Sequence, residues 1–319
     1  MKWNKLGQIF EFKKSSLANN FVSHAQSPQV VIYDNFIRIY FSTRKSDIGN
    51  FYISHIQFID LSDDLRCILR TSSHEVISMG GLGCFDEHGI FPLSPIRVGN
   101  RIYAYTSGWS RRISVSVETG IGLAISDNDG FTFKRYGNGP ILTSSLNEPF
   151  LIVDGFVRQF NDRFYMYYIF GKIWTEETET QVPERIYKIG LATSKDGINW
   201  EKHVGSQIIE DILGDQECQA LPTIIYHNGL YHMYFCYRYA TDFRANPSRG
   251  YRLGYAYSTD LIKWIRDDTN KGIELGIPGE WDSEMMCYPH LLEFNDKVYM
   301  LYNGNKFGKD GFGLAELMD

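Results

Sequence analysis

Short runs of apolar and aromatic residues, with polar residues between them, recur along the chain at nearly constant spacing. The runs end in tyrosine and lie at 37–40, 103–105, 165–168, 231–234 and 299–302. Their last tyrosines are 63 to 68 residues apart. Such runs predict β-strands, because aromatic side chains fit a half-buried pleated surface. We therefore expect five copies of one structural unit.

Each unit contains three further elements in the same order. A turn such as Asn228-Gly229 precedes the aromatic run, and before the turn lies an apolar run that opens with proline in four units. After the aromatic run comes a sequence similar to Ile-Gly-Leu-Ala, at 121–124, 189–192, 253–256 and 312–315. In three units a turn and an aromatic residue follow, which predicts a fourth strand. Four antiparallel strands repeated five times predict an all-β, five-bladed β-propeller.

The last unit lacks a fourth strand of its own. Near the other end of the chain, Trp3-Asn-Lys resembles Trp200-Glu-Lys and Trp264-Ile-Arg, which open fourth strands. We therefore expect the N-terminal segment to pair with the last blade and close the ring, which also protects a free sheet edge. Trp200 and Trp264 are expected to fill gaps between blades, and residues 51–54 to form the third strand of blade one. Residues 1–319 are then expected to form one propeller domain.

Composition narrows the range of partners and locations. Aromatic residues make up 15% of the chain, which suits strands and also the stacking of flat rings on sugars. The net charge is −6 and no long basic run occurs, which argues against a nucleic-acid partner. No apolar window is long enough to span a membrane, and no signal peptide is evident. Five scattered cysteines predict reduced thiols and a cytoplasmic protein rather than a disulfide framework or a zinc site.

The Ser-x-Asp-Gly-x-x-Trp turn at 194–200, the proline-led inner strands and the five-fold repeat make the chain similar to five-bladed propeller glycosidases. It resembles the arabinanases and xylosidases of glycoside hydrolase family 43, with invertase-type enzymes and mannoside phosphorylases as relatives. The resemblance covers the whole chain. It implies an axial pocket in which acids on the inner strands act on a glycosidic bond.

The resemblance also assigns individual residues. Asp154, in Val153-Asp154-Gly155-Phe156, takes the position of a blade-three aspartate that tunes the general acid. Glu217, which precedes a proline-led strand in blade four, takes the position of the general acid. His290 matches a blade-five histidine that contacts a calcium ion or a water on the axis. Two neighbouring carboxylates in an apolar pocket would raise one pKa, which makes a usable acid near neutral pH.

Blade one departs from the family pattern, because Ser27 precedes Pro28 where the family has an aspartate. Inverting hydrolysis needs a second carboxylate that activates water. Three explanations stay open: phosphate acts as the nucleophile, another acid does the work, or the site only binds. Asp86 lies two residues before His88, just ahead of the inner strand of blade two, and the two could act as acid and base.

Other polar and aromatic residues that flank the inner and aromatic strands are candidates for substrate binding. They are His24, Gln26, Arg44, His88, Trp109, Glu148, Arg238, Glu284 and His290. Further arginines crowd the loops at 111–112 and 244–252. Arginine side chains bind phosphate and carboxylate groups well. We therefore expect an anionic ligand beside or within the carbohydrate, which could be phosphate, a sugar nucleotide or an acidic sugar.

These observations favour a glycoside hydrolase or phosphorylase that acts on oligosaccharides in the axial pocket. The alternative is a glycan-pathway protein without hydrolysis, either a glycosyltransferase or a sugar-binding propeller that lacks the blade-one base. The absence of an acid at Ser27 favours the alternative or phosphorolysis. The presence of Asp154 and Glu217 favours retained catalysis.

Overall fold

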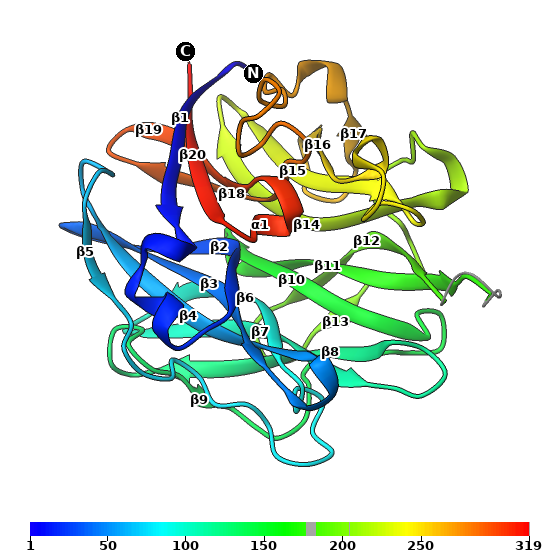
Figure 1. The fold of residues 1–319 in the computed structure, drawn as a ribbon. Coiled ribbons are helices and arrows are strands. Elements are labelled where there is room, and N and C mark those ends of the chain that lie inside the picture. The colour runs from blue at the N-terminus through cyan, green and yellow to red at the C-terminus, as the bar shows by residue number, and fades with distance from the viewer. Residues whose placement is uncertain (177–182, 204, 319) are drawn as a thin grey trace.

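The computed structural model describes residues 1–176, 183–203 and 205–318, and its main strands form five antiparallel sheets of four strands each. The sheets surround a common axis as the blades of a propeller (Figure 1). The first long strand of each blade lies innermost, where it packs against the inner strands of other blades. The predicted all-β, five-bladed fold is therefore confirmed.

From the axis outward, the strands of each blade follow their order in the sequence, except that β1 joins the last blade from the opposite end of the chain. Blade one consists of β2 (Ser23–Tyr33), β3 (Phe36–Ser46), β4 (Tyr52–Ser62) and β5 (Ile68–Thr71). Blade two consists of β6 (Ile90–Val98), β7 (Arg101–Arg111), β8 (Val117–Ser126) and β9 (Lys134–Arg135). Blade three consists of β10 (Phe150–Phe160), β11 (Arg163–Trp174), β12 (Arg185–Ser194) and β13 (Glu201–Lys202). Blade four consists of β14 (Glu217–His227), β15 (Leu230–Tyr239), β16 (Arg252–Ser258) and β17 (Ile265–Arg266). Blade five consists of β18 (Cys287–Phe294), β19 (Lys297–Asn303), β20 (Gly311–Leu317) and β1 (Trp3–Glu11).

Helical structure among the described residues is limited to single turns. One α-helical turn, α1, spans Asn305–Gly308. The 3₁₀ turns are η1 (Phe12–Lys14), η2 (Ser16–Asn19), η3 (Ile48–Asn50), η4 (Gly214–Gln216), η5 (Pro247–Arg249) and η6 (Asp268–Asn270). No helix in the described part of the chain is long and apolar enough to cross a bilayer.

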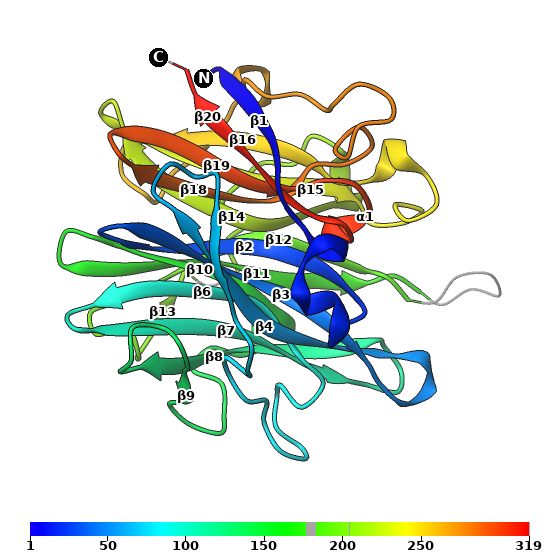
Figure 2. The ribbon, with the colours of Figure 1, turned by 60° about the vertical axis from the view of Figure 1, so that its left-hand side comes forward.

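The N-terminal strand closes the ring, as predicted. Strand β1 pairs antiparallel with β20, with Trp3 opposite Leu317 and Glu11 opposite Gly311. Figures 1 and 2 both show the two ends of the chain side by side. Trp3 also reaches the neighbouring blade, where its Nε1–H donates a hydrogen bond of 2.8 Å to the Tyr234 hydroxyl. Strand β1 thus joins blade five to blade four as well as completing a sheet.

In four pairs of adjacent blades, a tyrosine of the second strand of one blade forms a hydrogen bond to the other blade. The hydroxyls donate hydrogen bonds to carbonyl oxygens near the outer strand of a neighbouring blade, in the pairs Tyr40–Gly130, Tyr105–Gly197, Tyr167–Leu261 and Tyr234–Lys271. Trp200 packs edge-on against Tyr105, and Trp264 packs in the same way against Tyr167. These contacts confirm that the two tryptophans lie between blades. They also explain why the aromatic strands and the Ser-x-Asp turns repeat together, since each turn receives a tyrosine from the blade beside it.

Candidate functional site

A cavity of about 660 Å³ opens at the end of the propeller axis where the inner strands begin. Gln26 in β2, Asp154 in β10 and Tyr288 in β18 line it from the inner strands. Arg44 and Arg238 line it from the ends of the second strands. This follows from the hairpin connection, because the start of an inner strand and the end of its antiparallel partner lie at the same end of the blade. Residues far apart in the sequence therefore meet at one end of the axis.

Irregular pairing turns side chains of the inner strands toward the axis. The register between the first and second strands shifts in all five blades near the cavity end. At these shifts His24, Ser27, Asp154, Leu221 and Tyr288 have φ values of 74°, 53°, 58°, 49° and 57°. Such left-handed conformations are uncommon for non-glycine residues and often mark functional sites. Bulges of this kind re-aim side chains, and here they bring Asp154 into the cavity wall.

Asp154 is a buried acid with an unsatisfied oxygen. Only 5% of its surface is exposed, and its backbone N–H donates to Ser107 Oγ at 2.9 Å. Its Oδ1 atom has no hydrogen-bond partner among the described groups. Burial raises the pKa of Asp154 to about 7, an effect that the charge of Arg185 partly opposes. A carboxyl with this pKa exchanges its proton near neutral pH, as a general acid or base must.

Five arginines surround this single acid, which is the only one among the described residues that line the cavity. Arg111 forms an ion pair of 2.7 Å with Asp47, and Arg244 forms one of 2.6 Å with Glu184. The other three, Arg44, Arg185 and Arg238, have no carboxylate within ion-pair distance in the described part of the chain. The cavity therefore carries uncompensated positive charge, which favours an anionic ligand.

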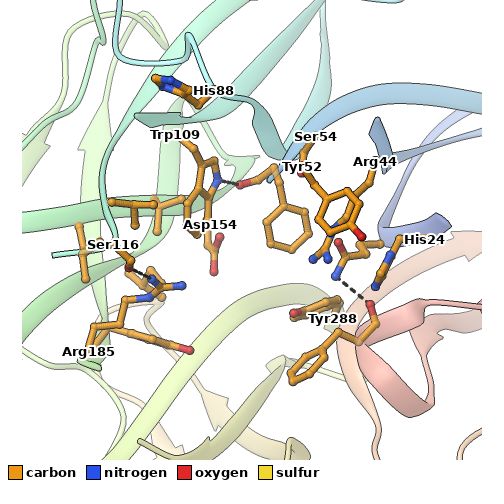
Figure 3. A pocket seen from close by; sticks show the side chains of 18 of the residues that line it. His24, Arg44, Tyr52, Ser54, His88, Trp109, Ser116, Asp154, Arg185 and Tyr288 are labelled. Atoms are coloured by element: carbon orange, nitrogen blue, oxygen red, sulfur yellow. Dashed lines mark hydrogen bonds between the residues drawn. The ribbon is translucent and has the colours of Figure 1, made fainter. Parts of the chain in front are cut away.

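Neighbouring groups fix two of these three guanidiniums in place. Arg238 is 3% exposed, lies 3.4 Å from the centre of the Phe243 ring and donates to the Tyr187 hydroxyl at 2.9 Å. Arg185 donates to Ser116 Oγ at 3.1 Å. Figure 3 shows Arg185 and Asp154 on one side of the cavity, with Arg44 on the other. Burial lowers the pKa of Arg44, which makes an anion beside it more favourable.

Aromatic side chains form much of the remaining wall. Trp109 is held by a hydrogen bond of 2.6 Å from its Nε1–H to the Phe91 carbonyl. Tyr187 and Tyr251 share a hydrogen bond of 2.5 Å between their hydroxyls. Phe307 lines the cavity from α1, where it has a left-handed φ of 60°. Such surfaces suit a sugar ring, which presents an apolar face to an aromatic ring and hydroxyls to the polar groups.

Two histidines complete the cavity. Burial lowers the pKa of His24 to about 3, with a further contribution from the charge of Arg44, so its ring is neutral. His24 Nδ1 lies 2.6 Å from Ser23 Oγ. His88 Nδ1 accepts a hydrogen bond of 3.4 Å from the Arg111 backbone N–H. The neutral His24 ring can therefore hold a hydroxyl group without adding charge.

The structure brings together seven of the residues that sequence analysis singled out. They are His24, Gln26, Arg44, His88, Trp109, Asp154 and Arg238. The remaining five, Asp86, Glu148, Glu217, Glu284 and His290, lie outside this cavity.

Glu217 does not share the cavity with Asp154, which corrects the expectation of a carboxylate pair. It is fully buried, with Oε1 2.6 Å from Arg266 and Oε2 accepting hydrogen bonds from the backbone N–H groups of Ile212 and Leu213. Arg266 comes from the outer strand of blade four, where no sequence pattern marks it as a partner. The Glu217 side chain is therefore engaged inside its own blade rather than at the axis.

The other three acids also have local roles or face solvent. The buried Asp86 carboxylate is held by Arg135. Glu148 accepts a hydrogen bond of 2.8 Å from the Tyr168 hydroxyl and pairs with Lys202 at 2.6 Å. Glu284 is exposed to solvent. The prediction that Asp86 and Glu284 line the axial cavity is thus wrong, because Arg135 holds the Asp86 carboxylate away from it and Glu284 faces solvent.

Sequence reasoning missed the residues that come from the beginnings of the third strands. Arg185 and Tyr187 of β12 line the cavity, and so does Tyr251 beside β16. A signal was present, because Tyr187 and Tyr251 each stand three residues before the glycine of the repeated Gly-containing motif. Their equivalent positions in two blades place them at the same end of the axis.

The calcium ion that the resemblance implies does not fit the residues around the axis. Ca²⁺ takes six to eight oxygen ligands, among them carboxylates. No group of three or more His, Cys, Asp or Glu side chains that could hold a metal occurs among the described residues. The side chain that adds charge near His290 is Arg158, a cation that opposes a metal ion. We therefore assign no role to calcium.

Comparison of the amino-acid sequence with known proteins identifies two relatives that match along the whole chain. No family model matches the chain. Two uncharacterized proteins from two strains of Mycobacterium tuberculosis are each 32% identical over 323 residues, and the alignments cover 99% of this chain and 99% of each relative.

Solved structures share the fold at low sequence identity. A glycoside hydrolase superposes with a TM-score of 0.74 at 18% identity, covering 99% of this chain and 91% of its own. A thermostable family-43 glycoside hydrolase gives 0.65 at 15% identity, covering 93% and 91%. A structure from a family of mannoside phosphorylases, which contains glycoside hydrolases that target β-1,2 mannosidic linkages, gives 0.61 at 15% identity, covering 92% and 84%. The chain therefore belongs to the family of the two mycobacterial proteins, and its fold is the five-bladed propeller of the glycoside hydrolases that its sequence resembles.

Proposed function

We propose that the chain is a carbohydrate-active enzyme that cleaves a glycosidic bond with phosphate in the axial cavity. One observation carries this proposal: a single protonatable carboxyl, Asp154, lines the same cavity as three guanidiniums that have no carboxylate partner among the described residues. Inverting and retaining hydrolysis each use two carboxyl groups. Phosphorolysis needs one acid and a bound phosphate, which matches this inventory of charges.

In the proposed reaction a phosphate oxygen forms a bond to the anomeric carbon while the glycosidic C–O bond breaks. The leaving oxygen takes its proton from Asp154, so the products are a sugar phosphate and a shortened glycan. Arg44, Arg185 and Arg238 hold the phosphate, since guanidinium forks bind its oxygens in a fixed geometry. Trp109 and the neighbouring aromatic rings hold the sugar. Glu217 and Asp86 take no part, because guanidiniums outside the cavity already engage both carboxylates.

By microscopic reversibility the same groups also transfer a sugar from a glycosyl phosphate to an acceptor hydroxyl. Asp154 then accepts the hydroxyl proton, and the arginines stabilise the departing phosphate. A transferase is thus the same site operating in the opposite direction, and the supply of phosphate and glycosyl phosphate decides which direction is observed.

The test is a panel of short oligosaccharides incubated with and without inorganic phosphate, with sugar phosphate as the measured product. We expect cleavage to require phosphate. Asp154→Asn should lower turnover by about 10²- to 10⁴-fold, the usual contribution of a general acid. The variant should fold normally, because asparagine tolerates the left-handed backbone at this position. Equal cleavage without phosphate would exclude phosphorolysis.

A second function, binding of an acidic glycan without catalysis, is favoured by the position of Glu217. The acid to which the resemblance assigns proton donation lies outside the cavity, while the three unpaired guanidiniums remain available for a sugar carboxylate. In this case no turnover occurs in either direction, and Asp154→Asn retains glycan binding that Arg44→Met weakens. Isothermal titration with uronate-containing and neutral oligosaccharides separates this function from the first.

A further inference from the structure

A second cavity, of about 440 Å³, lies at the opposite end of the axis. Val30 of β2, Arg158 of β10 and His290 of β18 line it, all from the later parts of inner strands whose beginnings line the first cavity. Aliphatic residues of β2, β14 and β18 make up most of its wall. Since the wall is largely apolar, the few polar groups in it determine what it binds.

His290 supplies a hydrogen-bond donor that lacks an acceptor. It is 1% exposed, and its Nε2 accepts a hydrogen bond of 3.2 Å from the Val30 backbone N–H. Burial keeps the pKa of His290 well below its ordinary value, so the ring is neutral and its one proton is on Nδ1. That Nδ1 atom is buried and has no partner among the described groups. A buried donor without an acceptor is costly, so the site favours an acceptor from outside.

Arg158 adds a positive charge without a counter-ion. Its Nη1–H donates to the Val157 carbonyl at 3.0 Å, and its guanidinium lies 4.3 Å from the centre of the Phe156 ring. No carboxylate forms an ion pair with it in the described part of the chain, although Glu293 lines the same cavity at its exposed rim. Burial lowers the pKa of Arg158 to about 10, which shows that its surroundings oppose an unpaired cation.

Arg158 and His290 lie close to one another. The charge of Arg158 contributes to the lowered pKa of His290, and both side chains flank the ring of Phe156. The His290 ring centre is 6.2 Å from that of Phe156. Both residues line the same cavity, where the Arg158 guanidinium and the one N–H of the His290 ring are hydrogen-bond donors. This combination repels a metal ion and matches a single negative charge.

We propose that this far end of the axis binds a small anion, a halide or a carboxylate, held by the Arg158 guanidinium and the Nδ1–H of His290. The ligand neutralises the charge of the half-buried Arg158 and accepts a hydrogen bond from the unpartnered N–H of His290. This anion site is separate from the proposed catalytic site, because none of its residues lines the first cavity.

Crystals grown without halide and soaked in sodium bromide test the position directly. We expect an anomalous peak beside His290 Nδ1 and Arg158 in the wild-type protein and no peak there in Arg158→Met. The methionine keeps the length and apolar stem of the side chain but removes its charge and donors. A wild-type crystal in which only water occupies this position would overturn the proposal.

Thermal unfolding tests the same site in solution. At constant ionic strength, replacing a bulky sulfonate anion by chloride should raise the Tm of the wild type, because a ligand that binds only the folded state stabilises it. A parallel series with acetate distinguishes a site that prefers carboxylate from one that prefers halide. Arg158→Met should show a smaller anion-dependent rise than the wild type, and Arg158→Lys should show an intermediate one.

Two controls separate this site from its surroundings. Arg44→Met removes a cation from the first cavity, and in this background Arg158→Met should still reduce the chloride effect. Glu293→Gln removes the carboxylate at the rim and should preserve or increase the effect, since a competing anion is gone. If Arg158→Met shows the same dependence on chloride and acetate as the wild type, the anion acts elsewhere and the proposal fails.

Discussion

Asp154 connects the chemistry of the cavity to the stability of the fold. An unfolded chain ionises this aspartate near its ordinary pKa of 3.8, whereas the folded protein keeps the proton until about pH 7. Between these values only the unfolded state releases the proton, so this residue makes the free energy of unfolding fall as pH rises from about 4 to 7. Below pH 4 the ionisation of Asp154 does not change the free energy of unfolding. Above pH 7 it has lowered that free energy by its full amount, at most about 4 kcal/mol.

Asp154→Asn should remove this dependence, because the amide carries no charge at any of these pH values. We expect the variant to gain stability relative to the wild type from pH 4 to pH 7 and to keep a constant advantage above pH 7. Urea unfolding of both proteins over this range measures the difference, in which the other titrating groups cancel. Parallel curves would show that Asp154 ionises normally in the folded protein.

Single residues also show where sequence reasoning succeeds and where it fails. Arg44 and Arg238, which sequence analysis gave as substrate-binding candidates, do line the cavity, because each lies near the end of a strand whose position the repeat defines. The assignment of Glu217 to the axis failed for a physical reason, since Arg266, 49 residues away, attracts its carboxylate. Local sequence does not reveal which distant cation pairs with an acid. Arg185 was missed because it lies at the start of a third strand, whose proximity to the axis depends on the hairpin geometry.

The glycine of the third strands has a packing role in every blade that carries the motif. A Cβ atom at Gly122, Gly254 or Gly313 would overlap the ring of Phe85, Phe235 or Trp281 respectively. At Gly190 it would press against Phe170. The motif therefore repeats because each blade places an aromatic ring against the backbone of its third strand. Elements of this kind are predictable from sequence, since the same contact imposes the same residue four times.

Gly254→Ala should destabilise the protein by about 1–3 kcal/mol, because the added methyl forces the buried Phe235 ring to move. Gly137→Ala is the matched control, since no atom lies within 4 Å of the Cβ position there. We expect the control to change stability little. The midpoints of urea unfolding compare the two variants, and equal midpoints would mean that the ring accommodates the methyl without cost.

At the scale of the whole molecule, the ring depends on the contact between β1 and the rest of the propeller. Trp3 is 7% exposed and packs in the largest apolar cluster, with residues of blades three, four and five. Trp3→Ala should therefore cost about 3–5 kcal/mol. Leu6→Ala on the same strand, where the side chain is 45% exposed, should stay within about 0.5 kcal/mol.

Denaturant unfolding followed by tyrosine and tryptophan fluorescence measures both changes. If closure of the ring is a late and dispensable step, Trp3→Ala will match Leu6→Ala. A single cooperative transition at lower denaturant concentration is the expected result, because blades four and five share the lost contact.

The pairing of Trp3 with Leu317 also sets the order of events during synthesis. A ribosome adds about 5–20 residues per second, so roughly 15–60 s pass between the appearance of β1 and that of its partner β20. Throughout that interval β1 lacks the strand with which it pairs, so Phe10, which is 1% exposed in the folded propeller, cannot yet pack against β20. The propeller cannot close before β20 has been made, so the ring is completed only after the inner strands of all five blades have been synthesised.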